Sequence, residues 1–115
     1  MSVVLHRPDI ESMEGQVLRD LQFSKLKKQL FRVYENSDYY RDKFNKAGVD
    51  PNRLKSWGDF NAYPFFDKDE ERISQQRSRA ELGHPFGMHI TCSHREINRV
   101  SASSGTTGAP TYVGY

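Results

Sequence analysis

The sequence predicts a chain of the α+β or α/β class, in which a mainly helical part is followed by a strand, a loop and a second strand. Residues 13–36 contain no proline and carry apolar side chains at helical spacing. A loop of glycine, serine and threonine separates two β-prone runs near the C-terminus. We therefore expect an N-terminal arm over residues 1–12, a helical subdomain over 13–82, and the start of a β-subdomain over 83–115, with the loop at 103–111.

The longest predicted helix, Met13 to Asn36, has apolar side chains on two sides. One stripe in its second half consists of Phe23, Leu26, Leu30, Val33 and Tyr34. Val17, Leu18 and Leu21 lie toward the opposite side, because successive residues of a helix are about 100° apart. The helix is therefore expected either to bend or to contact other parts of the protein on two faces.

A second helix is expected directly after the first. Ser37 is a suitable N-cap, and Gly48 is suited to the left-handed position that ends a helix. Asp50 and Pro51 then predict a turn.

Two further helical pieces have signals at their ends. Ser56 can cap a short turn that Pro64 brings to an end. Asp67 and Glu70 have the spacing of a capping box, which predicts a helix over residues 68–78 or beyond.

The character of the chain changes after Leu82, where two glycines and a proline interrupt it. Residues 88–92 and 96–102 read as strands, although apolar and polar side chains alternate only imperfectly in the second. A third β-prone run follows the loop at residues 111–113. The expected order is strand, loop, strand.

Charge and composition argue against several kinds of partner. The 17 Lys and Arg against 15 Asp and Glu leave a net charge of +2, whereas a nucleic-acid partner normally requires a basic patch. The basic run from Lys25 to Arg32 is better explained as the solvated face of a helix. No apolar stretch approaches the roughly 20 residues that cross a bilayer, so no membrane partner is expected. A single cysteine, Cys92, makes the cytoplasm the default compartment.

His84, His89 and His94 recur every five residues, with Cys92 nearby, and this pattern raises the question of a zinc site. Odd spacings place successive side chains on opposite faces of a strand, so the three histidines are not expected to converge. We expect surface or loop histidines, no metal site, and a buried or strand-facing thiol at Cys92.

Four aromatic residues lie close together in the second predicted helix and just before it. They are Tyr34, Tyr39, Tyr40 and Phe44. Aromatic side chains at helical spacing usually form core, and we expect core here in preference to a ligand cage.

The loop SSGTTGAPT, residues 103–111, has the composition of a phosphate site. Four hydroxyl residues alternate with Gly105 and Gly108, so hydroxyls and backbone N–H groups can face one concavity. It differs from a P-loop, since no lysine follows Gly108 and the chain continues as a β-prone run. By composition alone, a flexible linker is about as plausible as a phosphate site. The order of the residues favours the phosphate site.

This order resembles the signature of the AMP-forming adenylating superfamily, and other stretches resemble the phenylacetate-CoA ligase family in particular. The resemblance runs from about Ile10 to Tyr115. Besides the loop, it rests on Tyr34 and Glu35, Tyr40 and Arg41 before Phe44, Ala47 to Pro51, Pro64 and Phe65 before Lys68, Pro85 to Gly87, and Arg99.

The resemblance implies part of the large N-terminal domain of a ligase that activates a carboxylic acid with ATP and passes the acyl group to CoA. The loop would hold the terminal phosphates of ATP, with Mg²⁺ sharing their charge. The cofactor-binding residues it implies are Ser103, Ser104, Gly105, Thr106, Thr107, Gly108, Pro110 and Thr111. The hydroxyls of Ser104, Thr106 and Thr107 are the preferred donors, together with the amides of Gly105 and Gly108.

Some features depart from the family. Relatives often carry lysine where this chain has Ala109, and many superfamily members carry it at Thr111, so the loop lacks a positive charge of its own. Residues 74–80 look like an insertion without an assigned function. The adenine pocket, acyl pocket and catalytic lysine of the family would follow Tyr115, so we expect an inactive fragment that acts with the remainder of the ligase.

The identity of the acid and of the acceptor stays open at this point. An aromatic acid is favoured by the resemblance alone, and a homodimer is conceivable. Two alternatives remain: an adenylating enzyme with an acceptor other than CoA, and a non-catalytic helical interaction module whose Ser/Thr/Gly tail is a linker.

Overall fold

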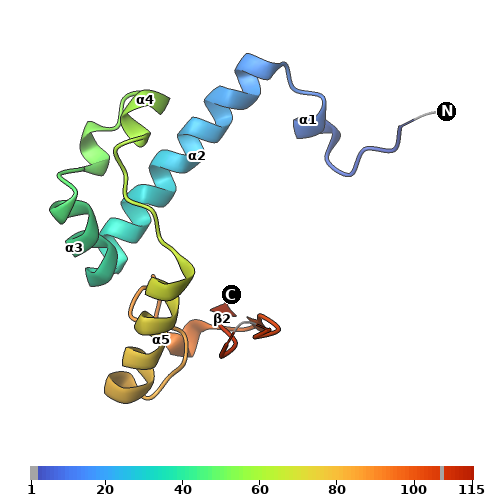
Figure 1. Ribbon diagram of the computed structural model, residues 1–115. Helices are drawn as coiled ribbons and strands as arrows, with labels where there is room; N and C mark the ends of the chain where they lie inside the picture. The colour runs from blue at the N-terminus through green and yellow to red at the C-terminus, as the bar shows by residue number, and fades with distance from the viewer. Residues whose placement is uncertain (1–2, 107) are drawn as a thin grey trace.

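The helix α2 (Gly15–Asn36) is the longest element of the computed structural model, which describes residues 3–106 and 108–115. Figure 1 shows α3 and α4 beside α2, while α5 and the C-terminal strands lie together farther along the chain. The other elements are α1 (Pro8–Glu11), α3 (Asp38–Lys46), the 3₁₀ turn η1 (Pro51–Arg53), α4 (Trp57–Phe60), α5 (Lys68–Leu82), the 3₁₀ turn η2 (His94–Glu96), β1 (Val100–Ala102) and β2 (Tyr112–Gly114). The predicted class, mainly helical and ending in strand, loop and strand, is confirmed.

The buried core lies where the second half of α2 meets α3 and the segment that follows it. Leu30, Phe44 and Leu54 are its buried apolar side chains. Tyr34 stacks on Phe44 with ring centroids 6.4 Å apart, and Tyr40 packs against the same ring. The expectation that these aromatic residues form core is confirmed for them.

The first half of α2 is less covered than the second. Leu30 is the buried residue of α2, whereas the side chain of Val17 is half exposed. Phe23 reaches Trp57 of α4, with ring centroids 5.4 Å apart. In the described residues the core therefore uses mainly one of the two apolar faces of this helix.

The expected caps are present at the helix ends. The Ser37 hydroxyl accepts the N–H of Tyr40 at 3.4 Å, and Gly48 has a φ of 69°. Capping boxes form at Ser56 and at Asp67. Helix α5 continues past residue 78 to Leu82, because the left-handed residue that ends it is Gly83.

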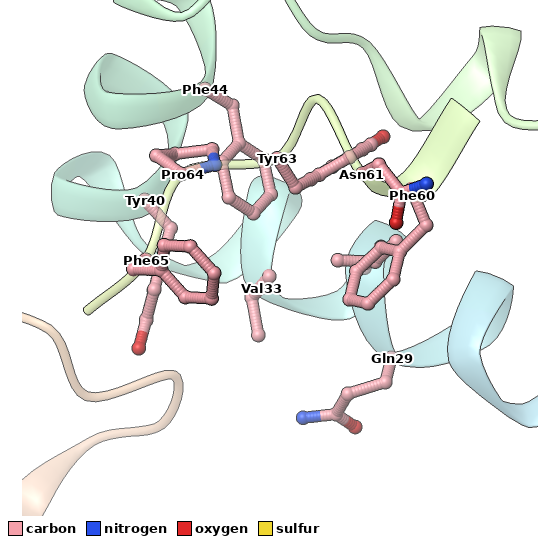
Figure 2. Close-up of a pocket in the computed structure, with 10 residues that line it drawn as sticks. Gln29, Val33, Tyr40, Phe44, Phe60, Asn61, Tyr63, Pro64 and Phe65 are labelled. Carbon is pink, nitrogen blue, oxygen red and sulfur yellow. The ribbon is translucent and has the colours of Figure 1, made fainter. Parts of the chain in front are cut away.

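An apolar pocket of about 420 Å³ opens beside the core, between α2, α3 and residues 60–65. Figure 2 shows the rings of Tyr40, Phe60 and Phe65 around it, with Val33 between Phe65 and Phe60. Phe65 is 94% exposed. The helical part of the chain thus leaves a large apolar side chain in contact with solvent.

Two predicted strands are wrong in whole or in part. Residues 88–92 form turns and bends, and the strand expected over 96–102 is limited to Val100–Ala102. At the start of the first segment, backbone amides are instead donated to serine side chains of α5. Gly87 N–H bonds to Ser78 Oγ at 2.9 Å, and Met88 N–H bonds to Ser74 Oγ at 2.8 Å.

Residues 74–80, which had no role assigned from the sequence, therefore include the side chains that hold the next segment in place. Ser74, Gln75 and Ser78 are buried. Ser78 Oγ also donates to the carbonyl oxygen of His84 at 2.7 Å. The short polar residues of this stretch thus form the inner face of α5.

The histidines lie in two places. The rings of His84 and His94 stack with centroids 4.9 Å apart, while His89 packs against Phe66 at 4.8 Å. Because residues 88–92 form no strand, the separation of the histidines does not follow from strand geometry. Cys92 is exposed, and the expectation of a buried or strand-facing thiol is wrong because the segment bends there. Across residues 3–106 and 108–115, three or more acidic, His or Cys side chains nowhere gather as they would around a metal ion.

Candidate functional site

The Gly/Ser/Thr loop joins the two strands of an antiparallel hairpin. Val100 pairs with Gly114 and Ala102 with Tyr112. Ser103 and Thr111 close the base of the loop, since Ser103 N–H donates to the Thr111 carbonyl at 2.9 Å and Thr111 N–H donates to Ser103 Oγ at 2.9 Å. The hydroxyl of Thr111 also donates to Ser103 Oγ at 3.2 Å. In this structure both residues therefore hold the shape of the loop.

The tip of the loop requires glycine at Gly105. Its φ of 68° is rare for residues with a side chain, and a Cβ there would lie 2.8 Å from the carbonyl oxygen of Gly108. The N–H of Gly108 donates to the carbonyl of Gly105 at 3.1 Å, which tightens the turn. The amide of Gly108, which we expected to face phosphate, is thus engaged within the loop.

Two of the three predicted side-chain donors lie in the described part of the loop, and both are exposed. Ser104 and Thr106 are exposed, whereas Thr111 is buried. The third predicted donor, Thr107, lies outside the described residues. Ser104 and Thr106 therefore have hydroxyls that can reach a ligand, while Pro110 lies where the loop returns toward β2.

Helix α5 fixes the position of the hairpin through one buried glutamine that the sequence did not reveal. Gln75 is 4% exposed. Its Nε2 donates to the carbonyl of Tyr112 at 2.8 Å, and its Oε1 accepts the N–H of Tyr112 at 3.1 Å. The side-chain amide therefore binds both backbone groups of the residue that follows the loop. Glutamine is common on exposed helix faces, so the sequence carries no signal for this contact.

A second link ties α5 to the helical part. The hydroxyl of Tyr39 donates to Glu70 Oε1 at 3.0 Å, and the ammonium of Lys43 pairs with the same oxygen. Lys43, and then Tyr39, hold the pKa of Glu70 below its ordinary value, against the opposing effect of burial. Burial, followed by the bond to Glu70, raises the pKa of Tyr39 to about 12. The loop is thus connected through α5 to α3.

Curated relatives of the chain are ligases. No protein-family model matches it. The phenylacetate-coenzyme A ligase of Thermus thermophilus is 37% identical over 97% of this chain, and that of Aromatoleum evansii is 41% identical over 92%. The enzyme of Escherichia coli is 36% identical over 92%. The chain spans less than a quarter of the length of these relatives, 23%, 22% and 22% in the same order.

Solved structures that resemble the chain are also CoA ligases. A crystal structure of 2-hydroxyisobutyryl-CoA ligase in complex with 2-HIB-AMP and CoA matches with a TM-score of 0.78 and 33% identity, over 93% of this chain and 22% of that one. An open conformation of the same ligase matches with a TM-score of 0.76 and 30% identity, over 91% of this chain and 23% of that one.

The fold and the sequence therefore correspond to a segment of acyl-CoA ligases of the adenylate-forming class. Nearly the whole chain is homologous to one segment of the phenylacetate-CoA ligases, which confirms the resemblance expected from the sequence.

Proposed function

We propose that the chain is the phosphate-gripping segment of an AMP-forming acyl-CoA ligase, and that the complete enzyme converts a carboxylic acid to an acyl-adenylate and then to a CoA thioester. The observation that carries this proposal is the loop between β1 and β2, with its glycine-dependent tip and the exposed hydroxyls of Ser104 and Thr106. The similarity to ligases over nearly the whole chain supports it.

Two displacements make up the reaction. In the first, a carboxylate oxygen of the acid bonds to the α-phosphorus of ATP, and the bond from that phosphorus to the bridging oxygen breaks, so pyrophosphate leaves. In the second, the sulfur of CoA bonds to the acyl carbon, its proton is lost, and AMP leaves with the bonding electrons. The loop acts in the first displacement, because pyrophosphate is the group that it would bind.

The task of the loop is electrostatic. Negative charge grows on the leaving pyrophosphate, and preorganised hydrogen-bond donors stabilise that charge where it develops. The hydroxyls of Ser104 and Thr106 would donate to phosphate oxygens, while Ser103 and Thr111 keep the loop closed at its base. Gly105 allows the phosphates to approach the backbone.

Mg²⁺, if it takes part, would arrive bound to the triphosphate and neutralise part of its charge. The described part of the loop offers hydroxyls and carbonyls but no carboxylate, and the described residues contain no cluster of three acidic, His or Cys side chains suited to a metal. This donor set fits an ion held mainly by phosphate oxygens and water.

The finer features of the function are also proposals. An aromatic acid fits the phenylacetate-CoA ligases to which the chain is similar, and CoA fits the acceptor that both groups of ligases are named for. The cytoplasmic location expected from the sequence remains a prediction, and the homodimer stays open. No helix in residues 3–106 or 108–115 has the length and apolar character needed to cross a membrane.

Acid-dependent release of AMP by the complete ligase that contains this chain tests the proposal. With ATP, CoA and phenylacetate the enzyme should form AMP and a thioester, and omission of CoA should leave adenylate formation intact. The 115-residue chain alone should release no AMP. A complete protein that makes no AMP with any aromatic or short aliphatic acid would refute the ligase assignment.

A further inference from the structure

One face of α5 borders the phosphate loop and carries two arginines. Arg72, Gln75, Gln76 and Arg79 lie at helical spacings of three, four and seven residues, which places them on one side of the helix. Together with Gly108, Ala109 and Pro110 they line a pocket of about 140 Å³. This is several times the roughly 30 Å³ that a water molecule occupies in the liquid.

Arg72 lies directly against the loop. A Cβ added at Gly108 would come within 3.2 Å of Nη2 and 3.4 Å of Cζ of Arg72. The side chain of Arg72 is 24% exposed, and its Nη1 lies 3.7 Å from a carboxylate oxygen of Asp69. Asp69 itself is 87% exposed, so its charge is largely screened by solvent.

Arg79 is held at the other end of the pocket by an aromatic ring. Its Cζ lies 5.3 Å from the centroid of Tyr112, within the range of a cation–π contact. Tyr112 is the residue that Gln75 binds through both backbone groups. The guanidinium of Arg79 and the end of the loop are therefore both positioned by Tyr112 of β2.

The loop itself supplies no charge to this pocket. Residues 97–115 contain no Asp or Glu, and the pocket-lining position Ala109 is neutral. Arg72 and Arg79 therefore line a pocket whose loop side lacks both competing carboxylates and a lysine. Guanidinium groups bind phosphate through paired N–H donors, which makes a polyphosphate anion the ligand that suits this pocket.

We propose that Arg72 and Arg79 form, with the loop, an anion site that binds the terminal phosphates of ATP and the leaving pyrophosphate. The inference builds on the proposed function, because it assigns to α5 the positive charge that the loop lacks. The two side chains bind phosphate directly, while Gln75 acts as a positioning residue by fixing Tyr112.

The test uses the complete ligase that contains this chain and the substitutions Arg72→Gln and Arg79→Gln. Arg77→Gln is the matched control, because Arg77 lies on the same helix, pairs with Glu81 at 3.1 Å and lines a different pocket. Isothermal titration with inorganic tripolyphosphate measures binding without turnover. Pyrophosphate-dependent ATP formation from the acyl-adenylate measures the KM for pyrophosphate.

Loss of either pocket arginine should weaken tripolyphosphate binding and raise the KM for pyrophosphate by about tenfold to a hundredfold, the effect of one charge-assisted contact. The affinity for AMP should be unchanged, and Arg77→Gln should bind tripolyphosphate like the wild type. Arg→Lys at either pocket position should recover part of the affinity, because the charge is kept but the paired donors are lost.

The outcome separates this inference from the proposed function. If Ser104→Ala weakens tripolyphosphate binding while both arginine variants bind like the wild type, the role of α5 is refuted and the loop assignment stands. If the complete protein makes no AMP but its arginine variants lose tripolyphosphate binding, the anion site is upheld and the ligase assignment fails. Equal losses in the pocket variants and in Arg77→Gln would also refute the inference.

Discussion

The imidazole Nδ1 of His89 lies 2.7 Å from Ser74 Oγ, a hydroxyl that also accepts the N–H of Met88 at 2.8 Å. The ring of His89 packs against Phe66, with centroids 4.8 Å apart, and against Tyr39. Burial in this place lowers the pKa of His89 below its ordinary value. The folded chain therefore favours the neutral imidazole.

We expect the chain to lose stability as the pH falls below about 6.5, the ordinary pKa of histidine. The unfolded chain takes up a proton at that pKa, whereas the folded chain resists protonation, so the contribution is fully present above this pH and is lost below it. His84 should also contribute to the loss of stability at low pH, because burial and then the neighbouring His94 lower its pKa. Urea unfolding at about pH 7.5 and about pH 5.5 measures the effect.

His89→Gln should reduce this dependence on pH, while the same substitution at the exposed His6 should leave it unchanged. If wild type and His89→Gln lost the same free energy of unfolding between the two pH values, His89 would not be a source of the effect.

Gln75→Leu should destabilise the chain by up to about 1–3 kcal/mol, because the backbone groups of the half-buried Tyr112 lose their hydrogen-bond partner. The substitution keeps the approximate size of the side chain but removes both hydrogen bonds to Tyr112. Gln76→Leu is the control, because Gln76 is the exposed neighbour. Thermal or urea unfolding measures both variants, and equal stabilities would show that the Gln75 contact contributes nothing measurable.

Ser104→Ala and Thr106→Ala should each slow adenylation in the complete ligase by about tenfold to a hundredfold, since each would remove a charge-assisted bond worth about 1.5–3 kcal/mol. Pyrophosphate-driven reversal should be slowed as well. Transfer to CoA from preformed acyl-adenylate should be nearly unchanged, because pyrophosphate has already left. Stopped assays of the two half-reactions measure the difference.

Two serines nearby separate a phosphate contact from a structural one. Ser101→Ala, at an exposed position of β1, should be silent in both half-reactions. Ser103→Ala, in contrast, should lower the free energy of unfolding of the chain, because the Ser103 hydroxyl accepts the N–H and the hydroxyl of Thr111. If Ser104→Ala and Thr106→Ala were silent in both half-reactions, the loop would be a linker and the phosphate assignment would have to be withdrawn.

The purified chain should bind a dye that reports exposed apolar surface, and Phe65→Ser should weaken the signal. Phe65 is 94% exposed beside the apolar pocket of Figure 2, so replacing it removes open apolar area without emptying the core. Fluorescence titration measures the binding, with Ile73→Ser as the control at an exposed apolar position of α5. A wild-type chain that binds no dye would contradict the prediction.

Local signals in the sequence were sufficient for the starts of three helices, whereas the short helix α1 lies in the segment expected as an arm. Ser37, Ser56 and Asp67 cap where their spacing predicts, because a cap depends on residues only a few positions away. The loop was also visible, since its two glycines and its hydroxyls are adjacent in the chain. The sequence did not show which of those hydroxyls are open to a ligand, because that depends on the pairing of Ser103 with Thr111.

The failures concern contacts between segments that are distant in the sequence. Ser74 and Ser78 resemble surface residues by type, yet they bind the amides of Met88 and Gly87 and so tie the start of residues 88–92 to α5. The arginines beside the loop were missed for the same reason. Their spacing places them on one face of α5, but only the packing of the hairpin shows what that face meets.

The bond between Gln75 and Tyr112 has a further consequence for association between chains. Ser103 donates its N–H to the Thr111 carbonyl across the hairpin, and the next residue of the second strand, Tyr112, has its N–H and carbonyl bonded to α5 and not to β1. Such outward groups on an edge strand are a template for adding another strand. Gln75 occupies both, and the side chain thereby blocks strand addition at Tyr112. A chain in which α5 opens would leave both backbone groups of Tyr112 as an unpaired strand edge.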